Sequence, residues 1–389
     1  CANTHGYTHN KQQNNLTATQ NIATKLKTKH HQIRPLEQKK FKTGKIIANL
    51  RKNNPKANTE LFVDDTSMHA AAETKLEVQS ILLKAMRDFK TLVQKLKLRL
   101  SPKAAIVASS NILAYKLNNK LTAYGLKFVL AHHSRDLGIT TTAGKTRPKH
   151  IQKDRQQKSR NRIFKVSQLA KISRSARKLY TGSGFSVSTW GHQACAVSQG
   201  EMHALETDAL ACSGIKTAGR CRTIALAVAY GVLGTPRARI IRETLRDFFT
   251  ILRNISPSEL LQLRTAWAEA KQELKKKSLS VASVHGILSN VIYILFHAQW
   301  NPIAFNFWED DTGGQWQIVD WKVSPDIVSA AITKSYLDIS LRKADSHHNG
   351  KGMYYGIDSA NTFRHVRSIK THTDINYQYK AAIETVMSG

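Results

Sequence analysis

The sequence predicts a mixed α/β chain, in which a small α/β segment is followed by a basic helical region, a helical bundle and a short α+β C-terminal segment. Three observations support this order. Apolar residues recur every three or four positions over 72–96, which is the period of an amphipathic helix. Lysine and arginine are dense over 145–178. After 301 the apolar period changes to the alternation that is typical of strands.

Composition limits the class of protein. The 389 residues are 41% hydrophobic, which is enough for two or three modest domains with cores of their own. The formal net charge is +32, from 59 Lys and Arg against 27 Asp and Glu, and this favours a polyanionic partner. We expect nucleic acid rather than a membrane, because no apolar run reaches the roughly 18 residues of a spanning helix.

The ends and the cysteines bear on the compartment. The chain starts at Cys1 with polar residues rather than with Met and a secretory signal, which indicates a fragment or a translation from mid-frame. The four cysteines (Cys1, Cys195, Cys212 and Cys221) suggest no disulfide framework. We therefore expect an intracellular protein, nuclear or cytoplasmic, and not a secreted one.

Residues 1–60 predict a weakly ordered basic arm, because they hold 12 Lys and Arg against two acids. Helix is expected there only around Lys39–Lys52. The arm is either a solvated tail or a non-specific nucleic-acid-binding segment.

Residues 61–144 predict strands covered by a long helix. The apolar face of the helix over 72–96 consists of Val78, Leu82, Met86, Phe89, Val93 and Leu96. Two strands, separated by a short helix, are expected to share one sheet: Ala104–Ala108 and Leu126–Ala131, with the helix over Asn111–Leu121. His132 and His133 then form a surface pair at a strand end.

An acid pair precedes the long helix. Leu61-Phe62-Val63 leads into Asp64-Asp65 and then Thr66-Ser67, which predicts a hairpin with both acids at its turn. Adjacent carboxylates repel each other, and a divalent cation such as Mg²⁺ relieves the repulsion. Paired metals of this kind clamp the attacking and leaving oxygens in nucleotidyl transfer. Taken alone, an Asp-Asp pair is more often a solvated turn.

Three motifs together resemble the reverse transcriptases of non-LTR retrotransposons over about residues 60–190. Phe62-Val63-Asp64-Asp65 looks like the aromatic-x-Asp-Asp box of that family. Leu100-Ser101-Pro102-Lys103 resembles its turn followed by a lysine, and Asp136-Leu137-Gly138-Ile139 resembles its Leu-Gly strand. The order of the motifs and the intervening helix agree with the family.

The resemblance implies a partial polymerase palm at 61–144 and a thumb at 145–222, which extend a DNA primer on an RNA template. It also implies the site residues. Asp64 and Asp65 would be catalytic and bind Mg²⁺ (or Mn²⁺), Lys103 would bind the nucleotide triphosphate, and Leu137 and Gly138 would position the primer.

The chain also departs from the family pattern. No aspartate precedes Asp64, and residues 1–60 lack the Gln-Gly turn that the family places against the nucleotide. The metal would therefore be weakly held and the enzyme incomplete. The alternative function is a non-catalytic basic nucleic-acid-binding remnant of a retrotransposon.

The basic region predicts a thumb helix. Residues 145–178 hold 13 Lys and Arg and one acid. Four cations expected on one helix face are predicted to bind nucleic-acid phosphates without reading bases: Arg155, Lys158, Arg162 and Lys165. The apolar stripe on another face is expected to be Ile163, Val166, Leu169 and Ile172. A solvated basic face is the ordinary alternative.

The remaining segments give structural predictions. Gly182-Ser183-Gly184 predicts a hinge. Five residues have spacings that match no usual zinc finger: His192, Cys195, His203, Cys212 and Cys221. Thr235-Pro236 and the capping box that starts at Ser256 predict two helices within 223–300, and the apolar stretch Val281–Ala298 predicts a third. Residues 301–389 are an α+β segment whose role the sequence does not indicate, with a helix capped by Ser324-Pro325. Within it, Asp310-Asp311 is a second acid pair that we interpret as turn chemistry.

Overall fold

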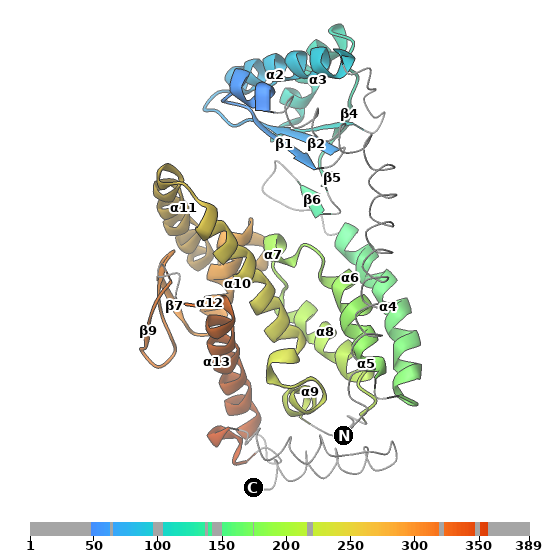
Figure 1. Cartoon of the computed structure of the whole chain (residues 1–389), viewed down its shortest axis with the longest axis vertical. Helices are drawn as coiled ribbons and strands as arrows, with labels where there is room; N and C mark the ends of the chain where they lie inside the picture. The colour runs from blue at the N-terminus through green and yellow to red at the C-terminus, as the bar shows by residue number, and fades with distance from the viewer. Residues whose placement is uncertain are drawn as a thin grey trace, which may run out of the picture. The chain divides into compact units, whose positions relative to one another are not determined.

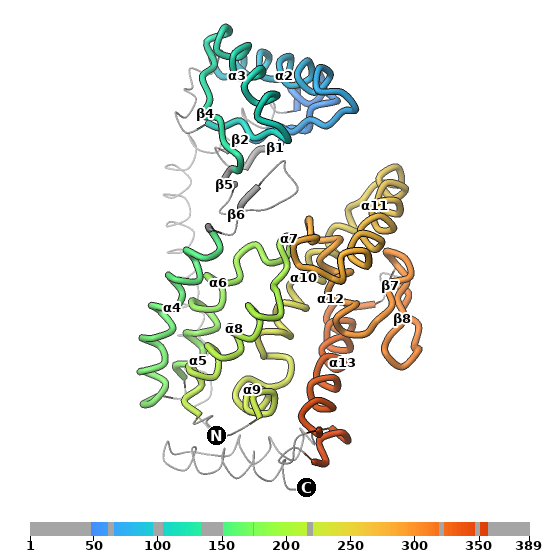
Figure 2. Tube along the Cα trace, turned by 180° about the vertical axis from the view of Figure 1, so that it is seen from behind, coloured from blue at the N-terminus to red at the C-terminus, as the bar shows by residue number. Residues whose placement is uncertain are grey.

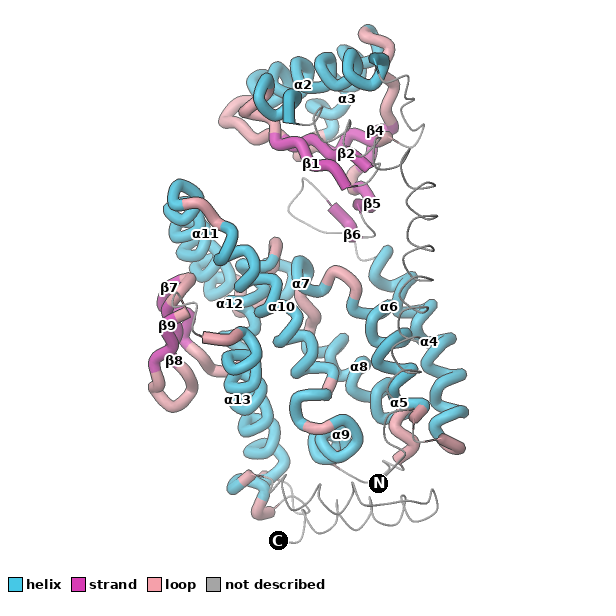
Figure 3. Tube along the Cα trace, viewed as in Figure 1, coloured by secondary structure: helices cyan, strands magenta, loops and turns pink. Residues whose placement is uncertain are grey.

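The computed structural model describes residues 48–62, 65–95, 104–136, 139–141, 150–173, 175–215, 221–318, 323–346 and 351–356. They belong to two compact units, one within Cys1–Ser134 and Thr142–Lys145 and the other within Arg135–Thr141 and Thr146–Gly389. The chain is mostly helical with small sheets (Figure 3). This confirms the predicted mixed α/β class.

The first unit begins with a hairpin backed by a long helix. β1 (Asn58–Phe62) and β2 (Asp65–His69) pair antiparallel. α2 (Lys75–Lys95) follows, and the hydroxyl of Thr74 accepts from the backbone N–H of Glu77 at its start. The predicted amphipathic helix is therefore present.

A β-α-β element completes this unit. α3 (Asn111–Ala123) connects the parallel strands β3 (Ala105–Val107) and β4 (Val129–Ala131). Figure 1 shows α2 and α3 side by side along the strands. Eight apolar side chains form the small core between them, of which the first three are fully buried: Leu117, Leu121, Leu126, Leu82, Leu83, Met86, Ile106 and Phe128.

Residues 48–60 are the part of the predicted basic arm that the structure describes, and they are ordered, with a helix that overlaps the one expected around Lys39–Lys52. They are helical at 48–53 and end in β1, and Leu50 is only 1% exposed. The amide of Asn54 donates to Asp88 Oδ2 at 2.8 Å, and Lys84 Nζ donates to the carbonyl of Asn53 at 3.1 Å. These bonds join the stretch to α2, which lies more than thirty positions away and is therefore invisible to local composition.

The prediction that strands within 104–108 and 126–131 share one sheet is confirmed, because β3 and β4 pair with each other. The described strands of this part of the chain do not all join that sheet. β1–β2 and β3–β4 are separate two-stranded sheets, and β5 (Ser134–Asp136) with β6 (Ile139–Thr141) forms a third. His132 and His133 lie between β4 and β5, at a strand end as predicted.

The second unit contains two groups of helices. The first group, seen from behind in Figure 2, is α4 (His150–Ala170), α5 (Ala176–Leu179), η1 (Tyr180–Phe185), α6 (Ser186–Thr189), α7 (His192–Cys195), α8 (Gln199–Ala211) and α9 (Arg222–Tyr230). α4, α6 and α8 pack together around a buried cluster that includes Ile163, Tyr180, Phe185 and Ala209.

Gly182-Ser183-Gly184 lies in the π-helical turn η1, between α5 and α6, and does not form the predicted hinge. Ser159 Oγ of α4 donates to the carbonyl of Gly184 at 2.7 Å. A Cβ at position 184 would lie 3.0 Å from Ile163 Cγ1. The glycine therefore serves the close packing of this turn on α4.

A second glycine fixes the end of α8 against the end of α4. Gly214 has φ +77°, and a Cβ there would lie 2.4 Å from the backbone oxygen of Ala170. A side chain would therefore clash with backbone as well as requiring an unfavourable conformation. The thiol of Cys212 donates to the carbonyl of Ile163 at 3.7 Å in the same contact.

The second group of helices surrounds a core of aromatic rings. It consists of η2 (Val232–Gly234), α10 (Pro236–Asn254), α11 (Pro257–Lys276), η3 (Val281–Ser283), α12 (Ile287–His297), α13 (Pro325–Asp345) and η5 (Met353–Tyr355). Phe248, Trp267 and Trp308 are buried, with ring centroids 5.9 to 6.3 Å apart, and Trp308 stacks on the other two rings.

The starts of α10, α11 and α13 are those that the sequence predicts, whereas the third predicted helix, Val281–Ala298, starts later: Val281–Ser283 is the short helix η3, and α12 begins at Ile287. Thr235 and Ser324 are N-caps followed by proline, and Ser256 with Glu259 forms a complete capping box. β7 (Asn301–Ala304), β8 (Phe307–Glu309) and β9 (Gln315–Gln317) form an antiparallel sheet beside α11 and α12. The predicted segments meet at positions 222 and 300, and the buried clusters contain residues from both sides of each position.

Candidate functional site

The acid pair is only partly within the described residues. Phe62 ends β1 and is paired with Asp65, which begins β2. The predicted hairpin is confirmed, but Asp65 lies in its second strand and not at the turn, because pairing continues to this residue. Asp64 lies outside the described residues, as do Lys103, Leu137 and Gly138.

The basic residues of α4 are arranged around the helix in two groups. Lys158, Arg162 and Lys165 are exposed and lie on one side; together with Arg155 we call them the basic flank. At 100° per residue these four positions fall within about 80° of one another. Asp154 is the one acidic residue in α4, so the helix itself offers these cations little negative charge.

Packing of the inner side of α4 keeps the basic flank facing solvent. Ile163, Val166 and Ala170 are buried against the first helical group, and Ser159 bonds the π-helical turn. The predicted apolar stripe is half wrong, because Leu169 and Ile172 are 49% and 77% exposed. Ala170 takes the inner position instead. The two exposed apolar residues continue the line of the basic flank toward the C-terminal end of α4.

Sequence reasoning missed a residue beside this flank. Trp190 is the C-cap residue that follows α6 and is 60% exposed. Its carbonyl oxygen accepts a hydrogen bond from Arg155 Nη1 at 3.2 Å. No local sequence pattern marks this position, because the contact joins residues 35 positions apart.

His192 has a structural environment. It is buried, its Nδ1 donates to the carbonyl of Thr189 at 2.8 Å, and its Nε2 lies 3.7 Å from Glu243 Oε2. Burial lowers the pKa of His192, which favours the neutral ring. The amide of Asn290 donates to the carbonyls of His192 and Gln193, at 2.9 Å each. The residue thus joins α7 to α10 and α12.

Two of the other zinc candidates, Cys212 and His203, also have a local structural environment. Burial raises the pKa of the Cys212 thiol to about 12, whereas a metal ligand must be a thiolate. Arg222 Nη1 donates to the ring of His203, 2.8 Å from Nε2. Among the residues that the structure describes, no group of three His, Cys, Asp or Glu side chains could hold a metal ion.

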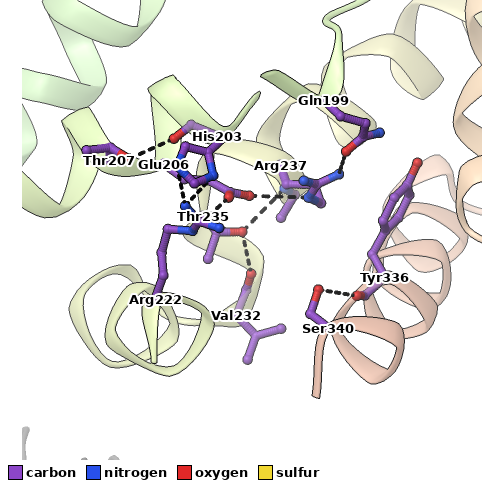
Figure 4. A network of polar contacts seen from close by, with 11 residues as sticks. Gln199, His203, Glu206, Thr207, Arg222, Val232, Thr235, Arg237, Tyr336 and Ser340 are labelled. Carbon is purple, nitrogen blue, oxygen red and sulfur yellow. Dashed lines mark hydrogen bonds and ion pairs between the residues drawn. The ribbon is translucent and has the colours of Figure 1, made fainter. Parts of the chain in front are cut away.

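Glu206 lies at the centre of a polar network (Figure 4). Its Oε1 is 3.3 Å from Arg237 Nε, and its Oε2 is 3.5 Å from Arg222 Nε. Arg237 also donates to Gln199 at 3.2 Å, and its guanidinium lies 4.9 Å from the ring centroid of Tyr336. The network joins α8, α9, α10 and α13, so we interpret it as structural.

The second acid pair has the predicted turn chemistry. Asp310 Oδ1 accepts from the backbone N–H groups of Thr312 and Gly314 at 2.9 and 2.7 Å, and Oδ2 accepts from Trp316 Nε1 at 2.9 Å. These bonds to the charged form lower the pKa of Asp310 to about 2. Asp311 accepts from Ser335 Oγ at 2.6 Å.

Comparison with known proteins adds no relative. Neither family models nor curated proteins nor solved structures match this chain. The resemblance to reverse transcriptases therefore depends on the motifs of this chain. In the part of the chain that the structure describes, no helix has the length and apolar character needed to cross a membrane.

Proposed function

We propose that this chain is a reverse transcriptase-like protein that binds an RNA template and a DNA primer through the basic flank of α4, and that its polymerase site is incomplete. The observation that carries the binding is the position of Lys158, Arg162 and Lys165. They are exposed on one side of a helix whose other side is fixed in a core. Such cations neutralise phosphates and orient the strand without reading its sequence.

Charge density adds to this support. The formal net charge of +32 draws any polyanion toward the protein. An arrangement of cations on a rigid helix gives that attraction a definite location. Phosphate binding of this kind releases counterions, so the affinity should fall steeply as the salt concentration rises.

The catalytic part of the proposal is supported by the order of elements. A hairpin bearing Asp65 is followed by α2 and by the strand-helix-strand element β3-α3-β4. Mg²⁺ in such enzymes is commonly held by one or two carboxylates together with water and substrate phosphates. Asp64 and Asp65 can supply that number of carboxylates. A bound Mg²⁺ would supply Lewis-acid stabilisation of the phosphates.

The carboxylates available also explain why the site is incomplete. Two metals held as a pair need further acidic ligands, and no aspartate precedes Asp64 in the sequence. In the proposal, Lys103 contacts the triphosphate, and Leu137 and Gly138 position the primer end.

The second candidate is a basic nucleic-acid-binding remnant without catalytic activity. It is favoured by the same missing aspartate and requires only the basic flank. The two candidates agree on binding and differ on primer extension.

The binding test uses two matched triple variants of α4 and its C-terminal end. One replaces Lys158, Arg162 and Lys165 with Gln. The other replaces Lys153, Arg160 and Lys171 with Gln, which removes the same charge from exposed residues on the other side of the helix. We measure the affinity for a primer–template duplex over a range of salt concentrations.

The flank triple should reduce the slope of log affinity against log salt by about 2 to 3, at roughly 0.9 per phosphate contact. The control triple should change it by less than about 1. Equal effects of the two triple variants would show that net charge alone governs binding, and would refute binding through the basic flank.

A further inference from the structure

Two adjacent tyrosines are exposed on a fixed turn that follows α13. Tyr354 and Tyr355 belong to the short helix η5 and are 63% and 91% exposed. Met353 anchors this turn, because it is 1% exposed and lies in the same buried cluster as Leu341 of α13. Asp345 Oδ1 accepts a hydrogen bond from the backbone N–H of Tyr354 at 3.3 Å. The backbone beneath the two rings is therefore held in place, while both side chains are exposed.

The two rings form an edge-to-face pair. Their centroids are 5.7 Å apart and their planes lie at 85° to each other, which is an arrangement that aromatic rings prefer. Such a contact covers at most one face of either ring, so Tyr355, at 91% exposure, has a ring face open to another flat group. Since a tyrosine side chain has only two torsions and this turn is fixed, little conformational freedom is lost when the ring binds.

The residues around the turn are basic. In the described residues 341–346 and 351–356, three exposed cations stand against one acid: Arg342, Lys343 and Lys351 against Asp345. Four positions separate Lys351 from Tyr355, which is at most about 14 Å of chain, and the turn shortens this distance. The open ring thus belongs to a basic segment of a chain whose formal net charge is +32.

An open aromatic ring in a basic segment has the chemistry that single-stranded nucleic acid requires. Its phosphates are attracted to lysine and arginine, and its unpaired bases stack on aromatic rings, whereas the bases of a duplex are already stacked on each other. We propose that Tyr355 is a stacking site for an unpaired base of a single strand whose phosphates are neutralised by Lys343 and Lys351.

This inference rests on the proposed binding of nucleic acid and adds a contact that selects single strands. Met353 of η5 and Ile163 of α4 lie in one buried cluster. The turn and the basic flank are therefore fixed on the same core, although they are far apart in the sequence.

The test compares three variants of the full chain: Tyr355→Ala, Tyr355→Leu and Tyr355→Phe. Leucine keeps a large apolar side chain without an aromatic face, and phenylalanine keeps the face. The control is Tyr115→Ala, which removes a tyrosine of 60% exposure from α3. The probes are a fluorescein-labelled 12-nucleotide strand of mixed sequence and the corresponding blunt 12-base-pair duplex. Thermal unfolding of each variant checks the fold.

Tyr355→Ala and Tyr355→Leu should weaken binding of the single strand by about 5- to 150-fold, the range for one stacked base. Duplex affinity should change by less than about twofold, and the salt slope should be unaltered because no charge is removed. Tyr355→Phe should retain most of the affinity, and Tyr115→Ala should behave as the unmodified chain.

An unchanged single-strand affinity in Tyr355→Ala would overturn the stacking site, as would an equal loss on the duplex or in Tyr115→Ala. Full affinity in Tyr355→Leu would also overturn it, because an apolar contact would then suffice. These failures are distinct from failure of the proposed function. If the flank triple lowers the salt slope but Tyr355→Ala has no effect, the flank stands and the stacking site falls. If the flank triple leaves the slope unchanged, binding through the flank itself falls.

Discussion

Arg155 donates a hydrogen bond to the backbone carbonyl of Trp190, 3.2 Å away. The same guanidinium belongs to the basic flank, so one side chain has both a charge and a structural role. These roles are separable, because lysine keeps the charge but lacks the planar fork of donors.

Arg155→Lys should therefore leave the salt slope of binding within about 0.5 of its original value. It should lower the free energy of unfolding by about 0.5–1 kcal/mol, the usual contribution of a partly exposed hydrogen bond. Urea titration and salt titration measure the two effects. A drop in the slope with unchanged stability would contradict the separation.

Primer extension is the second prediction. The chain alone should incorporate no measurable deoxynucleotide on a primed RNA template with Mg²⁺ or Mn²⁺, because Asp64 and Asp65 cannot hold two metals. Asp64→Asn is the control. Extension by the unmodified chain that Asp64→Asn abolishes would show that the site is complete, with a carboxylate from elsewhere in the chain.

Glu206 gives a prediction about stability. Glu206→Gln leaves Arg222 and Arg237 beside each other without the carboxylate between them. Because both arginines are partly exposed, we expect a loss of about 1–2 kcal/mol rather than the larger cost of a fully buried pair. The matched control is Glu273→Gln, which removes a surface pair with Lys277 and should cost about 0.3–0.5 kcal/mol. Thermal or urea unfolding of both variants measures the two losses in the free energy of unfolding.

Asp310 gives a prediction about pH. Its pKa is about 2 in the folded chain, below the ordinary value of 3.8. Its bonds therefore contribute fully above about pH 4, and the contribution is lost as the pH falls from about 4 to about 2. After allowance for solvent screening, Asp310→Asn should cost about 1 kcal/mol at pH 7 and nothing below pH 2.

The control is Asp154→Asn, which also removes an acid from this basic chain but lies exposed on α4. Stability measured against pH should show the acid-sensitive difference for Asp310→Asn only. The same difference in both variants would assign the effect to net charge.

The sequence predicts best those features that depend on a few neighbouring residues. The caps at Thr235, Ser256 and Ser324 lie where expected, because the signal is a side chain three or fewer positions from the N–H it accepts. The hairpin around Phe62 and Asp65 is of the same kind. Its register differs from the prediction by one residue, since apolar and acidic order does not set the length of a turn.

The apolar stripe of α4 shows why the sequence does not predict other features. Residues spaced strictly by three rotate by −60° at each step, so Ile172 lies on the side opposite to Ile163. The helix buries residues 159, 163, 166 and 170 instead. Two of these, Ser159 and Ala170, are a small polar and a small apolar residue, which a search for large apolar side chains does not identify. The packing of 48–60 on α2 and the position of Trp190 depend on contacts distant in sequence, and no local pattern indicates them.

Gly214 has a consequence for how this sequence can change over time. Its α carbon lies where any side chain would strike the carbonyl oxygen of Ala170, and its backbone is left-handed. Glycine has no conservative substitute, so every replacement here separates the ends of α4 and α8. Glycine at this position is therefore required for the contact that holds the C-terminal end of the basic helix α4.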